Sequence, residues 1–328
     1  MRAVLCRELG GPSALTVGDA PQPALRGPTS VRIAVHAAGI NFADTLIVAG
    51  KYQEKPDLPF IPGLEGAGVV IETGSAVKRV KVGDRVMATF NQGAFAEEAV
   101  TEENEVWPIP ASMDFATAAG FSVAYGTSHV GLKHRAGLKK GETLLVHGAA
   151  GGVGLTAVEI GTLMGATVIA TASNASKLEL ARSYGAAHLI DTSTDDLRER
   201  MRAITGGRGA DVIYDPVGGD LFDASVRLLA WEGRLLVVGF ASGRIPQAPA
   251  NILLVKNCSV MGFFWGAYRK HGPAVMRESF DELLAWYAEG RLKPHISERL
   301  DLAEVGPAMI AMQERRITGK VVLTTGRA

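Results

Sequence analysis

The chain has 328 residues, with 34 Lys or Arg against 34 Asp or Glu, so its formal net charge is zero. This balance argues against a protein that binds nucleic acid or anionic membranes through bulk positive charge. Hydrophobic residues make up 47% and only two residues are cysteine, which excludes general disorder, a disulfide scaffold and a cysteine-rich zinc site.

Short strands separated by turns are predicted as far as about residue 124. The candidates are residues 3–6, 30–36, 68–72 and 85–89, and proline and glycine punctuate the chain between them. This pattern predicts a β-rich domain.

Strands and helices alternate after residue 124. Short apolar runs at 143–147, 167–172, 188–191, 211–215, 234–239 and 259–264 are typical of parallel strands covered on both faces. Helical spacing separates most of them, as at 177–184 and 195–204, and a glycine follows each of these two helices. The alternation predicts a doubly wound parallel sheet of six strands, an α/β Rossmann architecture. An amphipathic helix at 275–288, a further short helix and a strand at 320–324 follow.

The most apolar stretch is residues 143–176, in which Glu159 is the only charged residue. A membrane helix is the alternative interpretation, but five glycines between Gly148 and Gly161 argue against it. Residues 1–17 contain no long apolar core and no small-residue cleavage site, so no secretory signal is expected. We therefore expect a cytoplasmic enzyme without a membrane span.

The strongest motif is the glycine-rich run after the strand at 143–147. Ala149, Gly151 and Gly154 occupy the three positions of a G-x-G-x-x-G dinucleotide motif, with alanine in the first place. Gly151 would let the backbone approach a pyrophosphate, and Gly154 would let the helix pack closely on the sheet. The helix N–H groups and the positive end of the helix dipole would hold the phosphates.

The end of the second parallel strand indicates which cofactor is used. Residues 170–177 contain no acidic side chain that would bind the ribose 2′-hydroxyl of NAD. Ser173 and Asn174 can donate hydrogen bonds and Lys177 supplies a positive charge, so NADPH is predicted over NADH. The alternative is that Lys177 is a solvated lysine in the first turn of a helix.

Five motifs together resemble the zinc-free quinone oxidoreductase branch of the medium-chain dehydrogenase/reductase superfamily over essentially the whole chain. They are residues 39–44, 62–70, 82–86, 149–154 and 318–322, and a narrower likeness within that branch adds residues 52–56, 229–234 and 251–265. The resemblance implies a GroES-like catalytic domain at 1–124, a Rossmann NADPH-binding domain at 125–266, and a C-terminal return to the catalytic domain at 267–328. It also implies an active cleft where the domains meet and a homodimer through the edge strand 259–264, which would protect that edge.

The resemblance bears directly on metal binding. Alcohol-dehydrogenase relatives hold catalytic zinc through Cys, His and Cys, and the matching positions here are Asn41, Leu64 and Ala119. None of these is a zinc ligand, and a lone Glu65 cannot hold zinc in a tetrahedral site. No metal is predicted. His147 is interpreted as a packed structural imidazole rather than a base.

The residues that contact the hydride acceptor are predicted from the resemblance. Asn41, at the place of a zinc cysteine, and Tyr52 are the catalytic candidates, because an amide N–H and a phenolic O–H can both donate to an acceptor carbonyl. The alternatives are a local turn bond for Asn41 and a loop aromatic that caps the barrel for Tyr52. Leu46, Phe264 and Trp265 are the pocket candidates, and a core or dimer role is the alternative for Phe264 and Trp265.

The cofactor side is assigned in the same way. Ala149, Gly151, Gly152, Val153 and Gly154 are predicted at the pyrophosphate, with Ser173, Asn174 and Lys177 at the 2′-phosphate. Further predicted contacts are Thr127, Thr192, Val217, Gly218, Gly239, Phe240, Ala241, Phe263 and Lys320. Lys320 has an alternative interpretation as a surface lysine.

The predicted function is an NADPH-dependent, zinc-free quinone oxidoreductase that transfers a hydride to a quinone. Quinones and activated alkenes fit a site without a Lewis acid, because hydride arrival yields a delocalised phenolate or enolate. An enone or enoyl-thioester reductase is the rival enzyme, and a non-catalytic NADPH-binding protein is the rival outside catalysis. The expected partner is a small-molecule quinone or activated alkene, with no nucleic acid and no membrane.

Overall fold

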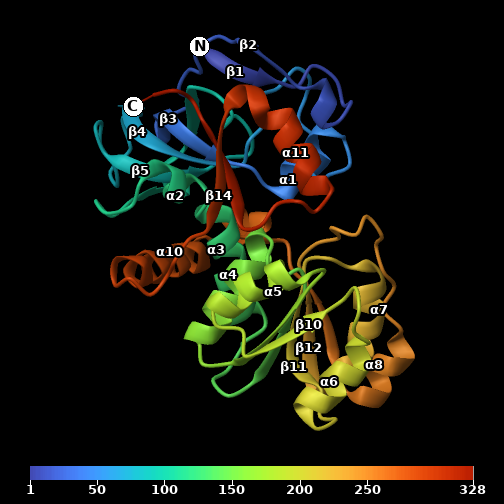
Figure 1. Cartoon of the computed structure of the whole chain (residues 1–328). Helices are drawn as coiled ribbons and strands as arrows, with labels where there is room; N and C mark the ends of the chain where they lie inside the picture. The colour runs from blue at the N-terminus through green and yellow to red at the C-terminus, as the bar shows by residue number, and fades with distance from the viewer. Residues whose placement is uncertain (328) are drawn as a thin grey trace. The chain divides into compact units, whose positions relative to one another are not determined.

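The computed structural model describes residues 1–327, which form two compact units. The first comprises Met1–Ala124 together with the chain from Phe280 onward, and the second comprises Tyr125–Ser279. Residues 267–279, which the sequence analysis places in the C-terminal return, belong to the second unit. Figure 1 shows the blue N-terminal and red C-terminal segments side by side in the first unit.

A mixed seven-stranded sheet organises the first unit. Its strand order is β14-β15-β3-β4-β5-β7, with β6 also paired to β3. The members are β3 (Ser30–Gly39), β4 (Glu65–Thr73), β5 (Arg85–Thr89), β6 (Glu98–Glu102), β7 (Val106–Pro108), β14 (Ile296–Asp301) and β15 (Lys320–Thr324). A separate antiparallel pair joins β1 (Arg2–Leu5) to β2 (Thr16–Asp19). The β-rich domain predicted from the sequence is confirmed.

Strand β15 brings the C-terminal segment into the middle of this sheet. It pairs antiparallel with β3, where Val322 lies opposite Gly39. The residue that begins β15, Lys320, therefore lies close to the end of β3 and to the loop that follows it. Lys320 is far from this loop in the sequence. Only the pairing of β15 with β3 in the sheet brings the two together.

Helices and a shared apolar core complete the first unit. The helices are α1 (Phe42–Val48), α2 (Phe115–Ala119) and α11 (Val305–Gln313). Figure 1 shows α11 beside α1. The core cluster includes Ile33, Val70, Phe95 and Leu323, all of them buried, so both chain segments contribute to one hydrophobic interior.

A six-stranded parallel sheet organises the second unit, as predicted. The order is β10-β9-β8-β11-β12-β13, and every neighbouring pair is parallel. The strands are β8 (Thr143–Val146), β9 (Thr167–Ala172), β10 (His188–Asp191), β11 (Ala210–Asp215), β12 (Leu229–Val237) and β13 (Ser259–Gly262). This order reverses between β8 and β11, and such a switch point is where open α/β sheets bind ligands beyond the carboxyl ends of their strands.

Helices connect these strands. They are α4 (Gly152–Leu163), α5 (Ala175–Ser183), α6 (Leu197–Thr205), α7 (Gly219–Leu228) and α8 (Ala250–Lys256), and the short α9 (Tyr268–His271) follows β13. Gly206 ends α6 in the left-handed conformation, as the sequence predicts. Two further helices, α3 (Ser122–His129) and α10 (Pro273–Ala288), each contain one of the points at which the chain passes from one unit to the other. Among residues 1–327, no helix combines the length and the apolar character needed to cross a membrane.

Candidate active site

Lys320 lies at the centre of a buried polar network in the first unit. Its side chain is 5% exposed, and its ammonium donates to the Ile40 carbonyl at 2.7 Å, to Asn41 Oδ1 at 2.7 Å and to Glu65 Oε1 at 2.8 Å. These bonds account for all the N–H groups of an ammonium. The interpretation of Lys320 as a surface lysine is wrong.

Glu65 is the anionic partner in this network. Its carboxylate is fully buried, with Oε1 receiving Lys320 and Oε2 accepting 2.8 Å bonds from Ser122 Oγ and the Val123 N–H at the start of α3. A buried carboxylate needs such partners to offset the loss of hydration. The sequence carried a signal for this pair, since Glu65 is a single charge in an otherwise apolar and glycine-rich run.

Asn41 is held by both charged residues. Its Oδ1 accepts from Lys320, and its Nδ2 donates to Glu65 Oε1 at 2.9 Å and to the Gly39 carbonyl at 3.4 Å. Both the oxygen and the nitrogen of the side-chain amide therefore form hydrogen bonds with other groups of the protein. The bond to Gly39 is the local turn contact that formed the alternative interpretation of this residue. In this arrangement Asn41 fixes the loop between β3 and α1.

Asp44 adds a second buried carboxyl group next to this network. Its Oδ2 accepts the Asn41 N–H at 2.8 Å, which caps α1, and its Oδ1 is buried without a hydrogen-bond partner. Burial raises the pKa of Asp44 to about 7, an effect that Asn41 and the positive charge of Lys320 oppose. The group therefore changes charge near neutral pH.

Tyr52 lies beyond α1, where the chain turns back. The Lys51 N–H donates to the Leu46 carbonyl at 2.8 Å, and Gly50 permits this turn through its positive φ of 68°. Tyr52 and Leu64 are partly buried and pack against the core of the first unit, and Leu46 is half-buried on α1. Burial, with smaller effects of the Glu54 and Asp44 charges, raises the pKa of Tyr52 to about 12, so the phenol is protonated at neutral pH.

The three positions matched to zinc ligands bear an amide and two hydrocarbon side chains. Asn41 is engaged by Lys320 and Glu65, and Leu64 and Ala119 have no donor atoms in their side chains. Within residues 1–327, no group of three or more His, Cys, Asp and Glu side chains is placed to hold a metal ion.

The glycine-rich run of the second unit forms a tight turn between β8 and α4. The Ala149 N–H donates to the Thr171 carbonyl of β9, and the Gly151 N–H donates to the Gly148 carbonyl at 2.9 Å. A Cβ at Gly154 would overlap the Gly148 carbonyl oxygen, whereas a Cβ at Gly151 would meet nothing nearer than 3.4 Å. Gly154 therefore serves the fold, and the open position at Gly151 is free to face a ligand.

The first turn of α4 supplies the groups that a pyrophosphate needs. Gly151 is the N-cap, and Gly152 and Val153 follow it as half-buried residues at the helix N-terminus. The first N–H groups of a helix have no partner within that helix, and the helix dipole favours an anion there. The residues present fit a dinucleotide phosphate.

Three predicted 2′-phosphate residues follow β9. Ser173 and Asn174 are exposed, and Lys177 is half-buried in the first turn of α5. Asn174 Oδ1 caps α5 by accepting the Lys177 N–H at 3.0 Å, so its amide nitrogen is the part of the side chain that can bind a ligand. Thr192 lies beside the end of β9, because its N–H and Oγ1 both donate to the Ala172 carbonyl.

The loops after β11 and β12 are held together by a residue that sequence analysis missed. Asp215 Oδ1 accepts the N–H groups of Val217 at 2.8 Å and Gly218 at 2.9 Å, while the buried Oδ2 has no partner. The Ala241 N–H in turn donates to the Pro216 carbonyl at 3.1 Å. Hydrogen bonds thus join the two loops that contain the predicted residues Val217, Gly218, Gly239, Phe240 and Ala241. The available signal was an acidic residue ending a buried strand.

The remaining predicted contacts differ in exposure. Thr127 is buried in α3, and Phe263 and Trp265 are buried after β13. Phe263 packs over Gly131, where a Cβ would meet its ring at 3.0 Å, so it has a core role in this unit. Phe264 is 39% exposed.

His147 ends the first parallel strand without contacting solvent. Its ring nitrogens lie 3.0 Å from Thr171 Oγ1 and 2.7 Å from Ser225 Oγ, and burial lowers its pKa. The interpretation as a packed structural imidazole is confirmed.

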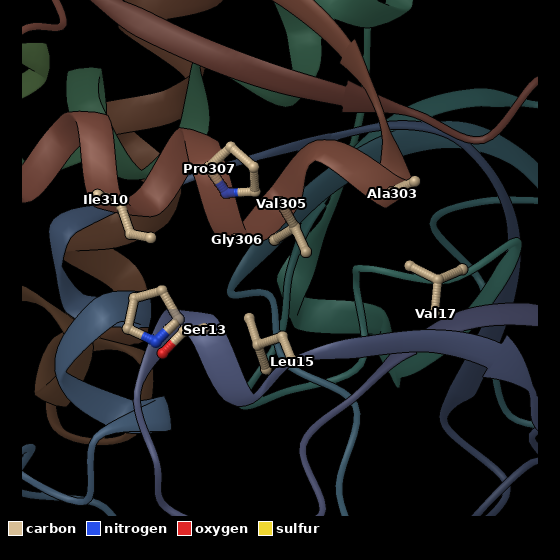
Figure 2. Close-up of a pocket in the computed structure, with 9 residues that line it drawn as sticks. Ser13, Leu15, Val17, Ala303, Val305, Gly306, Pro307 and Ile310 are labelled. Carbon is tan, nitrogen blue, oxygen red and sulfur yellow. The ribbon is translucent and has the colours of Figure 1, made fainter.

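A separate apolar pocket of about 240 Å³ lies in the first unit between α11 and the segment from residue 12 to β2 (Figure 2). It is lined by Pro12, Ser13, Leu15, Val17, Ala303, Val305, Gly306, Pro307 and Ile310. Among these nine only Ser13 has a polar side chain, and none is a predicted site residue.

Two family models match the chain. An alcohol dehydrogenase GroES-like domain matches residues 27–111, and a zinc-binding dehydrogenase model matches residues 152–289. The second model is described as a zinc-binding dehydrogenase, but Asn41, Leu64 and Ala119, the positions that the resemblance matches to zinc ligands, lie outside the residues that it matches.

Individual proteins show the same likeness along the whole chain. A quinone oxidoreductase-like protein 2 homolog of Nematostella vectensis is 47% identical over 327 residues, covering 99% of this chain and 89% of that protein. The structure of Escherichia coli quinone oxidoreductase complexed with NADPH is 30% identical, with a TM-score of 0.92 and coverage of 99% and 100%. A 2-haloacrylate reductase structure is also 30% identical, with a TM-score of 0.86 and complete coverage of both chains.

Proposed function

This chain belongs to the medium-chain dehydrogenase/reductase superfamily, in its zinc-free quinone oxidoreductase branch, and we propose that it is an NADPH-dependent quinone reductase. The proposal that NADPH is the cofactor rests on the turn at Gly148–Gly154. Gly154 is required by the fold, but Gly151 leaves open space at the start of α4, where a pyrophosphate binds best. The Escherichia coli relative described with NADPH supports the same cofactor here.

NADPH, when bound, would supply a hydride. Ser173, Asn174 and Lys177 would hold its 2′-phosphate, because the end of β9 offers donors and a positive charge and no competing carboxylate. Gly151, Gly152 and Val153 would hold the pyrophosphate. The loop group organised by Asp215 would shape the side of the site beyond β11 and β12.

We propose that the quinone, which accepts the hydride, binds at the segment from Asn41 to Tyr52. The protonated phenol of Tyr52 would donate to the oxygen that gains negative charge as a quinone is reduced. Leu46 and Leu64 would exclude water, and Asn41 would hold the loop in place. A quinone suits this site because its reduction needs orientation and hydrogen bonding rather than a Lewis acid.

Reduction of an activated C=C bond is the second candidate, and the likeness to a 2-haloacrylate reductase favours it. The deciding experiment compares kcat/KM for 1,4-benzoquinone, a small enone and crotonyl-CoA with NADPH as donor. Highest efficiency with the quinone supports the proposal, whereas highest efficiency with the enone or thioester supports the alkene reductase. NADPH that binds but is oxidised by no acceptor would overturn both in favour of a non-catalytic protein.

We also propose a cytoplasmic homodimer. Strand β13 is at the edge of the parallel sheet, and Trp231, Leu254 and Val255 are exposed on neighbouring elements. Pairing of β13 with its counterpart in a second copy would satisfy the free edge. Light scattering should give the mass of a dimer, and substitution of Val260 by proline should reduce it to a monomer.

A further inference from the structure

We infer that Glu65 and Lys320 form a positioning pair that holds the acceptor-side loop, and that Lys320 is not a contact of the cofactor. This inference deepens the proposed function and rests on it. It departs from the cofactor role that the resemblance implies for Lys320.

The first argument is the complete use of the Lys320 ammonium. Its three donors reach Ile40, Asn41 and Glu65 at 2.7–2.8 Å, and the side chain is almost fully buried. A phosphate or ribose contact would require one of these bonds to break and leave a buried acceptor unsatisfied. The ammonium is therefore committed to the loop at Ile40–Asn41.

The second argument is that Glu65 joins three chain segments through one carboxylate. It accepts from Asn41 in the loop after β3, from Lys320 at the start of β15, and from Ser122 and Val123 at the start of α3. Removal of either charge would leave the other buried without its partner, which is far more costly than removing both. The loop, the C-terminal strand and α3 are thus connected through the pair.

The third argument comes from the small residues around the pair. A Cβ at Gly39 would clash with the Ala119 carbonyl oxygen and would stand 2.6 Å from Glu65 Oε1, and a Cβ at Gly120 would stand 2.8 Å from Ile296 Cδ1 and 3.2 Å from the Lys320 Cβ. Both glycines have φ outside the left-handed region, so backbone conformation does not require glycine at either position. Close packing against neighbours that include both members of the pair is the requirement that these glycines meet.

The consequence is a fixed orientation for Asn41 and α1. The Asn41 amide cannot rotate without breaking bonds to both charges, and its backbone N–H is held by Asp44. Leu46 lies on α1 and Tyr52 follows the turn after it, so the pair sets the position of both acceptor-side residues. Lys320 and Glu65 act through these groups and touch neither reactant.

The test uses Lys320→Met, Glu65→Gln and the double variant, in the full chain. Arg299→Met is the matched control, because Arg299 pairs with Asp114 at 2.9 Å in the same unit but on the exposed surface. Three quantities are measured for each protein: the NADPH dissociation constant by fluorescence, kcat and KM for 1,4-benzoquinone, and hydrogen exchange of the α1 amides. Thermal melting identifies any variant that fails to fold.

Lys320→Met should lower kcat/KM for the quinone about tenfold or more and speed exchange in α1, while the NADPH dissociation constant changes less than about twofold. The double variant, which leaves no unpaired buried charge, should melt at a higher temperature than Lys320→Met but should not regain kcat/KM, because the bonds from Lys320 to Ile40 and Asn41 are still absent. Arg299→Met should change none of these quantities. A rise in the NADPH dissociation constant that matches the loss of kcat/KM, or a double variant with the kcat/KM of the parent protein, would overturn the inference.

Failure of the proposed function gives a different result. If the parent protein reduces no quinone, the quinone reductase proposal fails, but exchange in α1 and NADPH affinity still test the positioning pair. If hydrogen exchange of the α1 amides is unchanged in all variants of Glu65 and Lys320, the two residues do not position the loop, even if the enzyme is active.

Discussion

The carbonyl oxygen of Gly148 would overlap a Cβ on Gly154, so the turn after β8 and the first turn of α4 approach each other as closely as their backbones allow. Three residues before Gly154, a Cβ on Gly151 would meet the same oxygen at 3.4 Å, an ordinary van der Waals contact. Two glycines of one motif therefore have different tasks, and substitution by the same residue separates them.

Gly154→Ala should destabilise the fold, because the added methyl group has to displace a backbone carbonyl; a loss of about 1–3 kcal/mol is expected. Gly151→Ala should cost less than about 1 kcal/mol, since only the weaker helix cap is affected. The same change should raise the NADPH dissociation constant about tenfold or more, because the methyl group occupies the phosphate position. Chemical denaturation and fluorescence titration measure the two effects. Equal destabilisation by both substitutions would show that Gly151 also serves the fold.

Lys177→Met should weaken NADPH and spare NADH, because the 2′-phosphate is the only charged difference between them. We expect KM for NADPH to rise about tenfold and KM for NADH to change little, as measured by steady-state kinetics with a fixed quinone. Lys139→Met, at an exposed lysine of the same unit, is the control. Equal effects on both cofactors would instead identify Lys177 as a solvated helix lysine.

Tyr52→Phe should lower kcat/KM for the acceptor about tenfold while the NADPH dissociation constant stays the same, because only the donor hydroxyl is lost. Tyr287→Phe, in the same unit and outside the predicted site, serves as the control. A rate equal to that of the parent protein would remove Tyr52 from the mechanism.

Asp44→Asn should change how stability depends on pH. The folded protein holds a proton on Asp44 up to about pH 7, whereas the unfolded chain releases it near the ordinary value of 3.8. The folded state therefore binds more protons between these values, and the free energy of unfolding falls as pH rises, by at most about 4 kcal/mol. This component is fully present below the lower value and is lost above the higher one.

The measurement is urea denaturation of both proteins between about pH 5 and pH 8. The difference in unfolding free energy between the parent and Asp44→Asn should shift in favour of the variant as pH rises. Parallel pH profiles would mean that Asp44 is ionised throughout this range.

Periodicity predicted the parallel sheet well, because each strand in it is a short apolar run with its own turn or helix. Strands β5, β9, β10 and β15 begin and end at the predicted residues. Strands β2, β6, β7 and β14 were missed, since they are short or polar and depend on pairing with other segments. The run predicted at 259–264 ends at Gly262, after which Phe263 turns into the core.

The candidate site was less accessible to sequence reasoning than the fold. The glycine-rich turn is a local motif, so Gly151 and Gly154 were predicted together, and the close packing predicted for Gly154 is present. The pairing of Glu65 with Lys320 joins residues that only the sheet brings together, through β15 beside β3. The local sequence drew attention to each of the two residues separately, but it contained no information that their side chains are in contact.

The most direct test of the account is oxidation of NADPH in the presence of 1,4-benzoquinone by protein that has been exhaustively chelated. We predict rapid, quinone-dependent loss of NADPH absorbance at the same rate before and after chelation, since Asn41, Leu64 and Ala119 replace the zinc ligands. Activity lost on chelation and restored by zinc would contradict the account.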